Sequence, residues 1–169
     1  MTKNTKANDG VVPQARKGTG VRMIAIGCDH GGFELKNHVV KHLQDKGIEV
    51  KDYGVYNEDS VDYPDCAKPV CKAVISGEAE NGILICGTGI GISIAANKHK
   101  GIRAALCSDV YSAAMCKQHN NANILCMGGR VLGRELAFMI VDTWLENEFQ
   151  GGRHSKRIAK IHEIEEEEL

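Results

Sequence analysis

The sequence predicts an α/β protein, a three-layer α/β/α sandwich of Rossmann-like architecture with a five-stranded parallel sheet as its middle layer. Five short apolar runs alternate along the chain with amphipathic segments, and strands that are each followed by a helix pair in parallel through right-handed crossovers. The chain has 169 residues and a mass of 18.4 kDa, which suffices for one α/β domain and is too little for two of ordinary size. We therefore expect a single core.

Each element follows from its apolar pattern and from the residues at its ends. Strands are predicted at residues 22–27, 48–53, 82–86, 103–107 and 122–127. Helices are predicted at residues 33–46, 62–76, 90–99, 108–119 and 134–149, with a last helix after residue 152 that ends in an acidic run. Gly47 and Gly77 stand where the first two helices must end, because glycine readily adopts the left-handed conformation found there.

Residues 1–21 are predicted to form a disordered N-terminal extension, and residues 22–169 to form the domain. The extension contains Lys, Thr, Asn, Gly and Pro13 with almost no apolar periodicity. Its basic residues suggest an organellar address as an alternative, but the serine content and amphipathic pattern of such an address are lacking.

The composition excludes several classes of function. A formal net charge of -1 and a pI near 6.6 give no basic footprint for nucleic acid. No run approaches the roughly 18 apolar residues of a membrane span, and the N-terminus lacks the apolar core of a secretory signal, so we expect a cytoplasmic protein that acts on a small molecule. The cysteines number seven and form no C-x-x-C pair, which favours reduced thiols over a disulfide framework or a zinc ribbon.

The stretch 82–98, GILICGTGIGISIAANK, carries the strongest functional signal. An apolar strand turns through Gly87-Thr88-Gly89, and a helix restarts at Ile90. Backbone N–H groups at a helix start have no partner within the helix, so an oxyanion or phosphate fits against them. The glycines run G-x-G-x-G rather than G-x-G-x-x-G, which disfavours a dinucleotide. A tight turn that only allows close helix packing is the alternative.

Cys86 ends this strand beside the turn. A thiol at a helix N-terminus can act as a base or nucleophile, because the positive end of the helix favours the thiolate. Taken alone, a free cysteine is more often a small buried hydrophobic residue. Cys28, Cys107 and Cys126 also lie near strand ends. A group of these cysteines that binds a metal or carries out redox chemistry is therefore a further alternative, although no metal-ligand spacing accompanies it.

Other polar residues stand at element ends. Asp29 and His30 suit recognition of hydroxyls and a phosphate, although an aspartate before a helix usually caps it. His119, followed by two asparagines, fits a capping role at a helix end. Arg153 and Arg157 share one helical face in the first turns, where an external anion would offset their conflict with the helix dipole; a solvated basic surface is the alternative.

In combination these residues resemble the sugar-phosphate isomerases of the ribose-5-phosphate isomerase B type, a family that also contains allose- and galactose-6-phosphate isomerases. The resemblance covers residues 23–164 and rests on the motifs GCDHGG, VDYPD, GILICGTGIGISIAANK, GIRAA, QHN, GGRV and GGRH, in this order. It implies the same α/β/α sandwich, an aldose–ketose isomerase that uses no cofactor or metal, and a homodimer or tetramer whose sites are shared between subunits.

The resemblance also implies a role for each matching residue. Cys86 is expected to be the base that moves a proton between C2 and C1 as ribose 5-phosphate becomes ribulose 5-phosphate, and Thr88 to assist proton exchange at the sugar oxygens. His119 is expected to open the furanose ring. The expected substrate ligands are the turn residues Gly87, Gly89, Ile90 and Gly91 for the enediolate oxygen, Asp29 and Asn120 for the sugar, and His30, Arg130, Arg153 and Arg157 for the phosphate.

Two alternatives remain beside this function. The first is an isomerase of a six-carbon phosphate such as allose 6-phosphate or galactose 6-phosphate, because the loop between Tyr53 and Tyr63 sets the depth of the pocket. The second is a non-catalytic module that binds a sugar phosphate or nucleotide on the same scaffold. A base at Cys86 favours catalysis, because a binding module has no use for a base.

Overall fold

The computed structural model describes residues 23–168, so the predicted extension at residues 1–21 lies outside the described residues. Five parallel strands form one sheet in the order β2-β1-β3-β5-β4. The strands are β1 (Met23–Cys28), β2 (Glu49–Asp52), β3 (Asn81–Cys86), β4 (Ala104–Leu106) and β5 (Ile124–Gly128). The predicted five-stranded parallel sheet is confirmed.

The helices also follow the predicted order. They are α1 (Phe33–Asp45), preceded by the 3-10 turn η1 (His30–Gly32), and then α2 (Tyr63–Ser76), α3 (Ile90–Ala96), α4 (Val110–Asn120), α5 (Arg134–Glu146) and α6 (Arg153–Glu168). Gly47 and Gly77 follow α1 and α2 with φ of 74° and 76°, the left-handed conformation expected of them.

Two helices, α3 and α5, each end three residues before the predicted limit, and side chains of asparagine explain both ends. Asn97 follows α3 and pairs with the backbone of Ala104 through both amide atoms, at 2.8 and 2.9 Å, which turns the chain toward β4. Asn147 follows α5 in an extended conformation, and its Nδ2 donates to the carbonyl of Thr143 at 2.6 Å. Because asparagine bonds readily to nearby backbone, it ends helices that the apolar pattern alone would extend.

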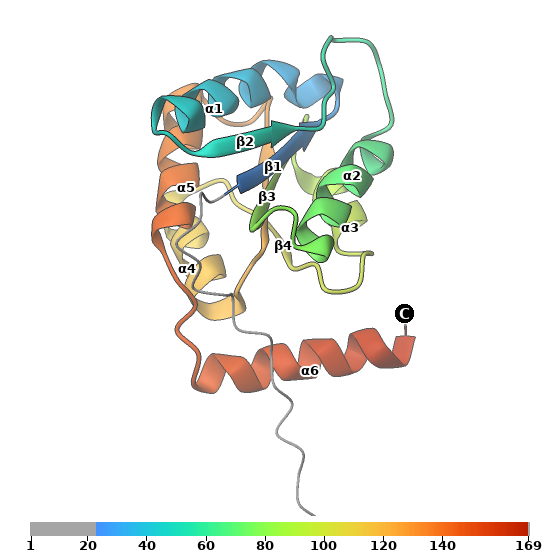
Figure 1. Cartoon of the computed structure of the whole chain (residues 1–169), viewed down its shortest axis with the longest axis vertical. Helices are drawn as coiled ribbons and strands as arrows, with labels where there is room; N and C mark the ends of the chain where they lie inside the picture. The colour runs from blue at the N-terminus through green and yellow to red at the C-terminus, as the bar shows by residue number, and fades with distance from the viewer. Residues whose placement is uncertain (1–22, 169) are drawn as a thin grey trace, which may run out of the picture.

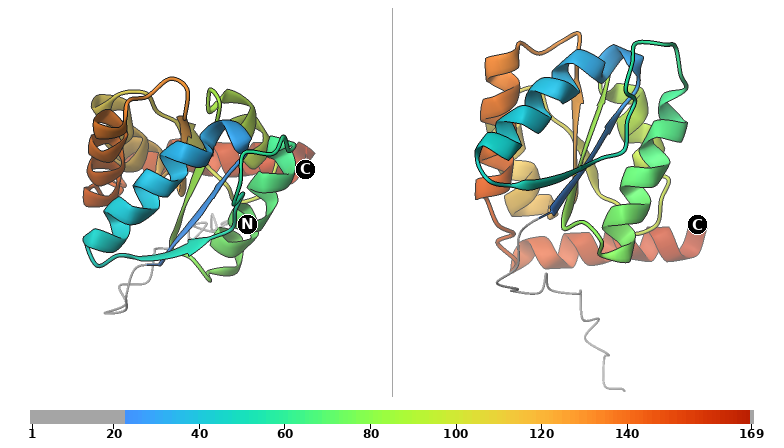
Figure 2. Two further views of the ribbon diagram at one scale, coloured as in Figure 1. Left: turned by 90° about the horizontal axis from the view of Figure 1, so that it is seen from above. Right: turned by 45° about the horizontal axis from the view of Figure 1, so that its top comes forward.

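The helices cover both faces of the sheet, which confirms the three-layer sandwich (Figures 1 and 2). One face packs against α1, α4 and α5, with Trp144 fully buried there, and the other packs against α2 and α3. Neighbours along β3 alternate between the layers, Ile83 and Ile85 facing one core and Leu84 the other, because side chains in a strand have a period of two. All six residues of this central strand are buried.

The connections between the strands change direction in the middle of the sheet. The chain leaves β1 through α1 on one face, and leaves the neighbouring strand β3 through α3 on the opposite face. The carboxyl ends of β1 and β3 therefore lie at a topological switch point, where ligands bind in open α/β sheets.

Helix α6 lies apart from the two helical layers and runs beneath the sheet, on the side where the strands begin (Figures 1 and 2). Glu165 of this helix accepts a hydrogen bond from the amide of Gly101, just before β4, at 2.9 Å. Among residues 23–168, no helix has the length and apolar character needed to span a membrane.

Candidate active site

The turn between β3 and α3 is tightly packed around Cys86. The thiol is 4% exposed, and the amide of Gly89 donates to its Sγ at 3.1 Å. Gly89 has a φ of 78°, and a Cβ at this position would lie 2.7 Å from the carbonyl carbon of Met127 in β5. Only glycine combines that conformation with that close approach. The thiol is therefore held in one place beside the start of α3.

The loops after β1 and β5 interlock with this turn. The amide of Asp29 donates to the carbonyl of Ile85 at 3.1 Å, and the amide of Gly129 donates to the carbonyl of Cys86 at 2.8 Å. A Cβ on Gly31 would lie 3.0 Å from the Cα of Gly87. Backbone contacts rather than long side chains thus bring the ends of the three central strands together.

This interlock gathers one group of predicted site residues at the carboxyl edge of the sheet. Asp29 is buried, and its Oδ1 accepts from the amide of Gly32 at 3.1 Å, so the predicted capping contact is present. The amide of Arg130 donates to the carbonyl of Gly87 at 3.0 Å, which puts this arginine beside the turn. We call this group the thiol cluster; its members are Asp29, His30, Cys86, Gly87, Thr88, Gly89, Ile90, Gly91 and Arg130.

Tyr63 borders the thiol cluster, although it is not among the predicted site residues and enters the sequence analysis only as the end of the loop that sets the depth of the pocket. A Cβ on Gly91 would lie 2.7 Å from Cζ of Tyr63, so the phenol ring at the start of α2 covers the first turn of α3. The motif VDYPD contained the signal, since a tyrosine beside the first proline of a helix stands at the same edge of the sheet as the turn.

Four other thiols are buried in the two cores of the protein. Burial raises the pKa of Cys28 to about 12 and that of Cys71 to about 11, and it raises the pKa of Cys126 well above the usual range. The thiol of Cys107 bonds to Cys116, which together with burial raises the pKa of Cys107. Cys28, Cys71, Cys107 and Cys126 are therefore protonated at neutral pH and pack as small apolar side chains.

The remaining predicted site residues lie at the opposite edge of the sheet. His119 and Asn120 end α4, and Arg153 and Arg157 begin α6. Since α4 follows a parallel strand, its C-terminus lies where the strands begin, as Figure 1 shows. We call His119, Asn120, Arg153 and Arg157 the histidine cluster. Within one chain, the histidine cluster therefore does not meet the thiol cluster.

His154 joins the two halves of the histidine cluster. Its ring stacks on His119 with centroids 4.2 Å apart and planes 7° apart. The side chain is 5% exposed, and burial, with the nearby His119, Arg153 and Arg157, lowers the pKa of His154 below its usual range. The ring is therefore neutral at neutral pH, and Nε of Arg153 lies 3.5 Å from its Nε2.

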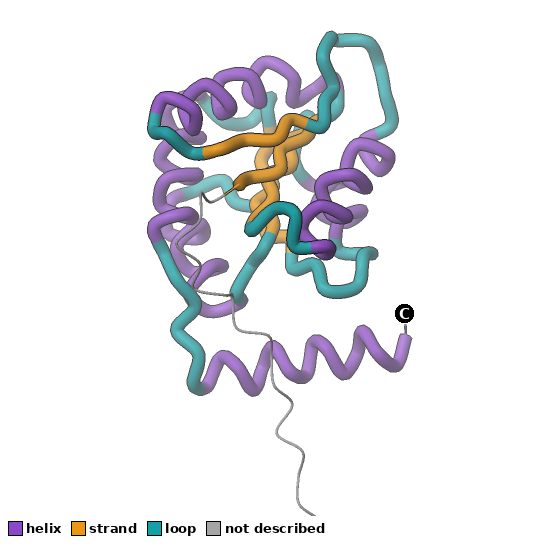
Figure 3. Tube along the Cα trace, in the orientation of Figure 1, coloured by secondary structure: helices purple, strands orange, loops and turns teal. Residues whose placement is uncertain are grey.

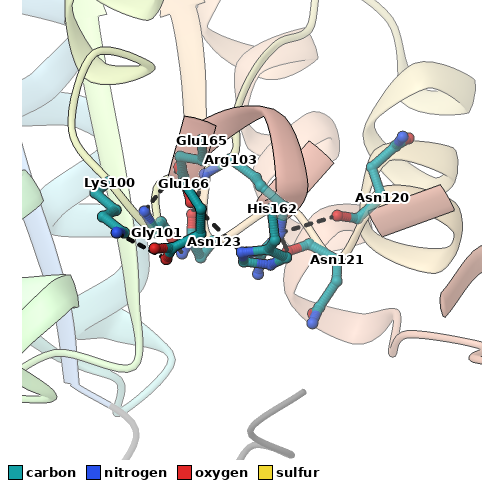
Figure 4. Close-up of polar contacts among 9 residues, drawn as sticks. All are labelled: Lys100, Gly101, Arg103, Asn120, Asn121, Asn123, His162, Glu165 and Glu166. Atoms are coloured by element: carbon teal, nitrogen blue, oxygen red, sulfur yellow. Dashed lines mark hydrogen bonds and ion pairs between the residues drawn. The ribbon is translucent and has the colours of Figure 1, made fainter. Parts of the chain in front are cut away.

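A polar network fixes the chain next to the histidine cluster (Figure 4). Nε of Arg103 donates to the carbonyls of Asn120 and Asn121, at 3.2 and 3.0 Å, and so caps the end of α4. Burial lowers the pKa of Arg103, while the carboxylate of Glu165 acts in the opposite direction. The sequence predicts Arg103 as the first residue of a strand and as part of the GIRAA motif, and nothing in its spacing predicts that it faces the end of α4.

A pocket of about 510 Å³ lies between α6 and the edge strand β4, on the side of the histidine cluster. Its lining is partly apolar, with Ile161 and Ile164 from α6, and partly polar, with Arg103 and Asn120. Within residues 23–168, no group of three or more His, Cys, Asp or Glu side chains is placed to hold a metal ion.

A buried thiol and peptide amides at a switch point, with cationic side chains near both edges of the sheet, are typical of an α/β enzyme that acts on a small anionic substrate. The family model for ribose/galactose isomerases matches residues 24–161, so the chain belongs to that family. This confirms the family resemblance and the isomerase class inferred from the motifs.

Individual relatives support the same assignment. Ribose-5-phosphate isomerase B of Escherichia coli is 53% identical over 146 residues, which is 86% of this chain and 98% of that protein. A structure of ribose-5-phosphate isomerase B from Clostridium thermocellum superimposes with a TM-score of 0.86 at 56% identity, covering 87% of this chain and 99% of the other. The Mycoplasma genitalium enzyme, solved with bound ribulose-5-phosphate, has a TM-score of 0.82 at 44% identity, with 86% and 97% covered.

Proposed function

We propose that this protein interconverts D-ribose 5-phosphate and D-ribulose 5-phosphate. The observation that carries the proposal is the position of Cys86, a buried thiol in hydrogen-bond contact with the β3–α3 turn at the switch point. The relatives from Escherichia coli and Clostridium thermocellum are named for this activity, and the Mycoplasma genitalium structure holds its product. A cytoplasmic location is part of the proposal and rests on the sequence alone.

Cys86 acts as the base. The hydrogen at C2 of an open-chain aldose is weakly acidic, so the enzyme must remove it and stabilise the oxyanion of the enediolate at the same time. The thiolate takes the proton from C2 and returns it to C1, while amides of the turn from Gly87 to Gly91 donate to the enediolate oxygen. Thr88, whose side chain is exposed at the turn, exchanges the proton between the two sugar oxygens.

The histidine cluster acts on the same sugar from a second copy of the chain. A six-residue strand such as β3 is about 20 Å long, which is too far for one sugar phosphate to reach from Cys86 to His119 of the same chain. Each site of a homodimer, alone or within a tetramer, therefore combines one thiol cluster with the histidine cluster of the other copy. His119 then opens the furanose ring, Asn120 holds the sugar, and Arg153 and Arg157 bind the phosphate with His30 and Arg130.

Exposed apolar side chains near both clusters support the association. Ile90 and Ile94 lie one turn apart on α3 and are 53% and 57% exposed, beside the thiol cluster. Ile161 and Ile164 are exposed on α6, at the pocket beside the histidine cluster. Apolar surface that borders both clusters is what a subunit interface requires.

The test is a coupled assay with ribose 5-phosphate, allose 6-phosphate and galactose 6-phosphate side by side, without added metal or nucleotide. Turnover of the pentose phosphate with little of either hexose supports the proposal. Preference for a hexose phosphate would keep the mechanism and change the substrate. This second candidate function is favoured by the description of the family, which includes both ribose and galactose isomerases. A folded protein that turns over none of the three would instead be a binding module.

A further inference from the structure

The loop between β2 and α2 lies over a buried charge of α1 that the proposed mechanism does not use. The loop projects at the carboxyl edge of the sheet, as the arch at the top of Figure 3. Lys36 of α1 places its ammonium group beneath it: the side chain is 1% exposed, and Nζ lies 2.7 Å from Oδ2 of Asp52 and 2.8 Å from the carbonyl oxygen of Val55. Nζ also lies 5.1 Å from the ring centroid of Tyr56. A buried lysine is costly unless it is paired in this way.

These contacts fix the first half of the loop on the end of β1. The second carboxylate oxygen of Asp52 accepts from the amide of Gly54 at 2.8 Å, and the backbone carbonyl of Asp52 accepts from the Tyr56 hydroxyl at 2.9 Å. The amide of Val55 donates to the carbonyl of Cys28 at 3.1 Å. Lys36 therefore holds a segment that lies directly beside Asp29 and His30.

The second half of the loop touches the site itself. The amide of Val61 lies 3.3 Å from Nδ1 of His30. An amide N–H can only donate, so Nδ1 accepts and carries no proton. The ring proton is then on Nε2, on the side of the ring away from Val61, where it can be donated to a ligand.

We propose that the loop 52–61 is a positioning element for His30, in which the amide of Val61 selects the Nε2–H tautomer and Lys36 anchors the loop. This inference rests on the proposed function, because the acceptor assigned to Nε2–H is the phosphate of the substrate. The loop residues need not touch the sugar to act; they present His30 as a hydrogen-bond donor before the substrate arrives.

The first test is nitrogen-15 NMR of the histidine rings in the ligand-free protein, which separates the two tautomers. Wild type should show His30 as Nε2–H. Val61→Pro removes the amide hydrogen and should give a mixture of tautomers, whereas Val61→Ala keeps the amide and should match wild type. An Nδ1–H ring in wild type, or a Val61→Pro spectrum like that of wild type, would overturn the inference.

The second test compares two lysines on α1 that each pair with an aspartate. Lys36→Met releases the loop, and we expect KM for ribose 5-phosphate to rise roughly 5- to 10-fold, the size of one ordinary hydrogen bond, with kcat nearly unchanged. Lys41→Met breaks the exposed pair with Asp45, 2.9 Å apart, and should change neither constant. A Lys36→Met enzyme with unchanged KM and an unchanged His30 tautomer would remove Lys36 from the proposal.

The two tests separate this inference from the proposed function. A wild-type protein with the Nε2–H ring but no turnover of ribose 5-phosphate would overturn the proposed function and leave the contact between the loop and His30 in place. A wild-type protein that turns over ribose 5-phosphate but carries the Nδ1–H ring at His30 would overturn this inference and leave the proposed function in place.

Discussion

The thiol cluster and the histidine cluster are built by different means. The thiol cluster lies on the ends of three buried strands, and its parts meet through backbone contacts that glycine makes possible, such as Gly31 against Gly87. The histidine cluster lies on the end of α4 and the start of α6, and side chains hold it: the stack of His119 on His154 and the bonds from Arg103 to the end of α4. The first is part of the core, and the second is attached to it.

This difference suggests a division of labour. The proton transfer at C2 and C1 needs a base and donors placed within a few tenths of an ångström, which a close-packed turn supplies. Ring opening and phosphate binding tolerate more movement, because charge acts over longer distances than orbital overlap. Arg153 and Arg157, at the start of the peripheral helix α6, meet that looser requirement.

The largest effect should come from the thiol. Cys86→Ala removes the proposed base, so kcat should fall by about 10³, within the range of a positioned acid or base, while inorganic phosphate or a substrate analogue still binds. Coupled kinetics and calorimetric titration measure the two properties. Cys71→Ala is the matched control, since burial keeps that thiol protonated. Activity of Cys86→Ala within a few-fold of wild type would exclude the thiol as the base.

The next largest effect tests whether the two clusters meet between chains. Cys86→Ala and His119→Ala should each be nearly inactive, but a co-expressed mixture should recover about a quarter of wild-type activity, because half of the randomly paired dimers then contain one intact site. Cys86→Ala mixed with Asp29→Asn is the control, since both changes are in the thiol cluster and no intact site forms. If both mixtures show equal, negligible activity, the thiol cluster and the histidine cluster do not form a site that is shared between two chains.

The two clusters also differ in how far the sequence predicts them. The strand, glycine turn and helix around Cys86 are consecutive in the chain, so local pattern sufficed for the part of the thiol cluster from Cys86 to Gly91. Asp29, His30 and Arg130 follow other parallel strands and reach it through the sheet. The distance between Cys86 and His119 depends on strand order, which no local pattern contains. Lys36 and Arg103 show the further limit, because a charged residue in an amphipathic segment predicts an exposed side chain, whereas Lys36 is buried by partners far along the chain.

Arg157 should show a moderate effect on binding alone. Arg157→Ala removes one proposed phosphate ligand, and we expect KM to rise roughly 10- to 100-fold with a smaller change in kcat, because charged hydrogen bonds contribute about 1.5–3 kcal/mol. Steady-state kinetics give both constants. Lys156→Ala removes an exposed cation from the preceding position of α6 and serves as the control for charge alone. An unchanged KM for Arg157→Ala would count against the phosphate assignment.

The smallest effect concerns the stability of the histidine cluster as pH falls. The pKa of His154 is lowered, so below its ordinary value of 6.5 the unfolded chain binds more protons at this ring than the folded protein does. Stability therefore rises with pH through this window and is lost as pH falls below 6.5. His154→Phe keeps an aromatic ring against His119 but cannot bind a proton.

Thermal unfolding at about pH 7 and about pH 5 should thus show a larger loss of Tm for wild type than for His154→Phe, by a margin on the order of 2 °C. Comparing the change with pH, rather than Tm itself, removes the packing difference between the two rings, because that difference is present at both pH values. Parallel pH profiles would mean that His154 takes up its proton as readily in the folded protein as in the unfolded chain. The stack on His119 would then hold a cationic ring as well as a neutral one.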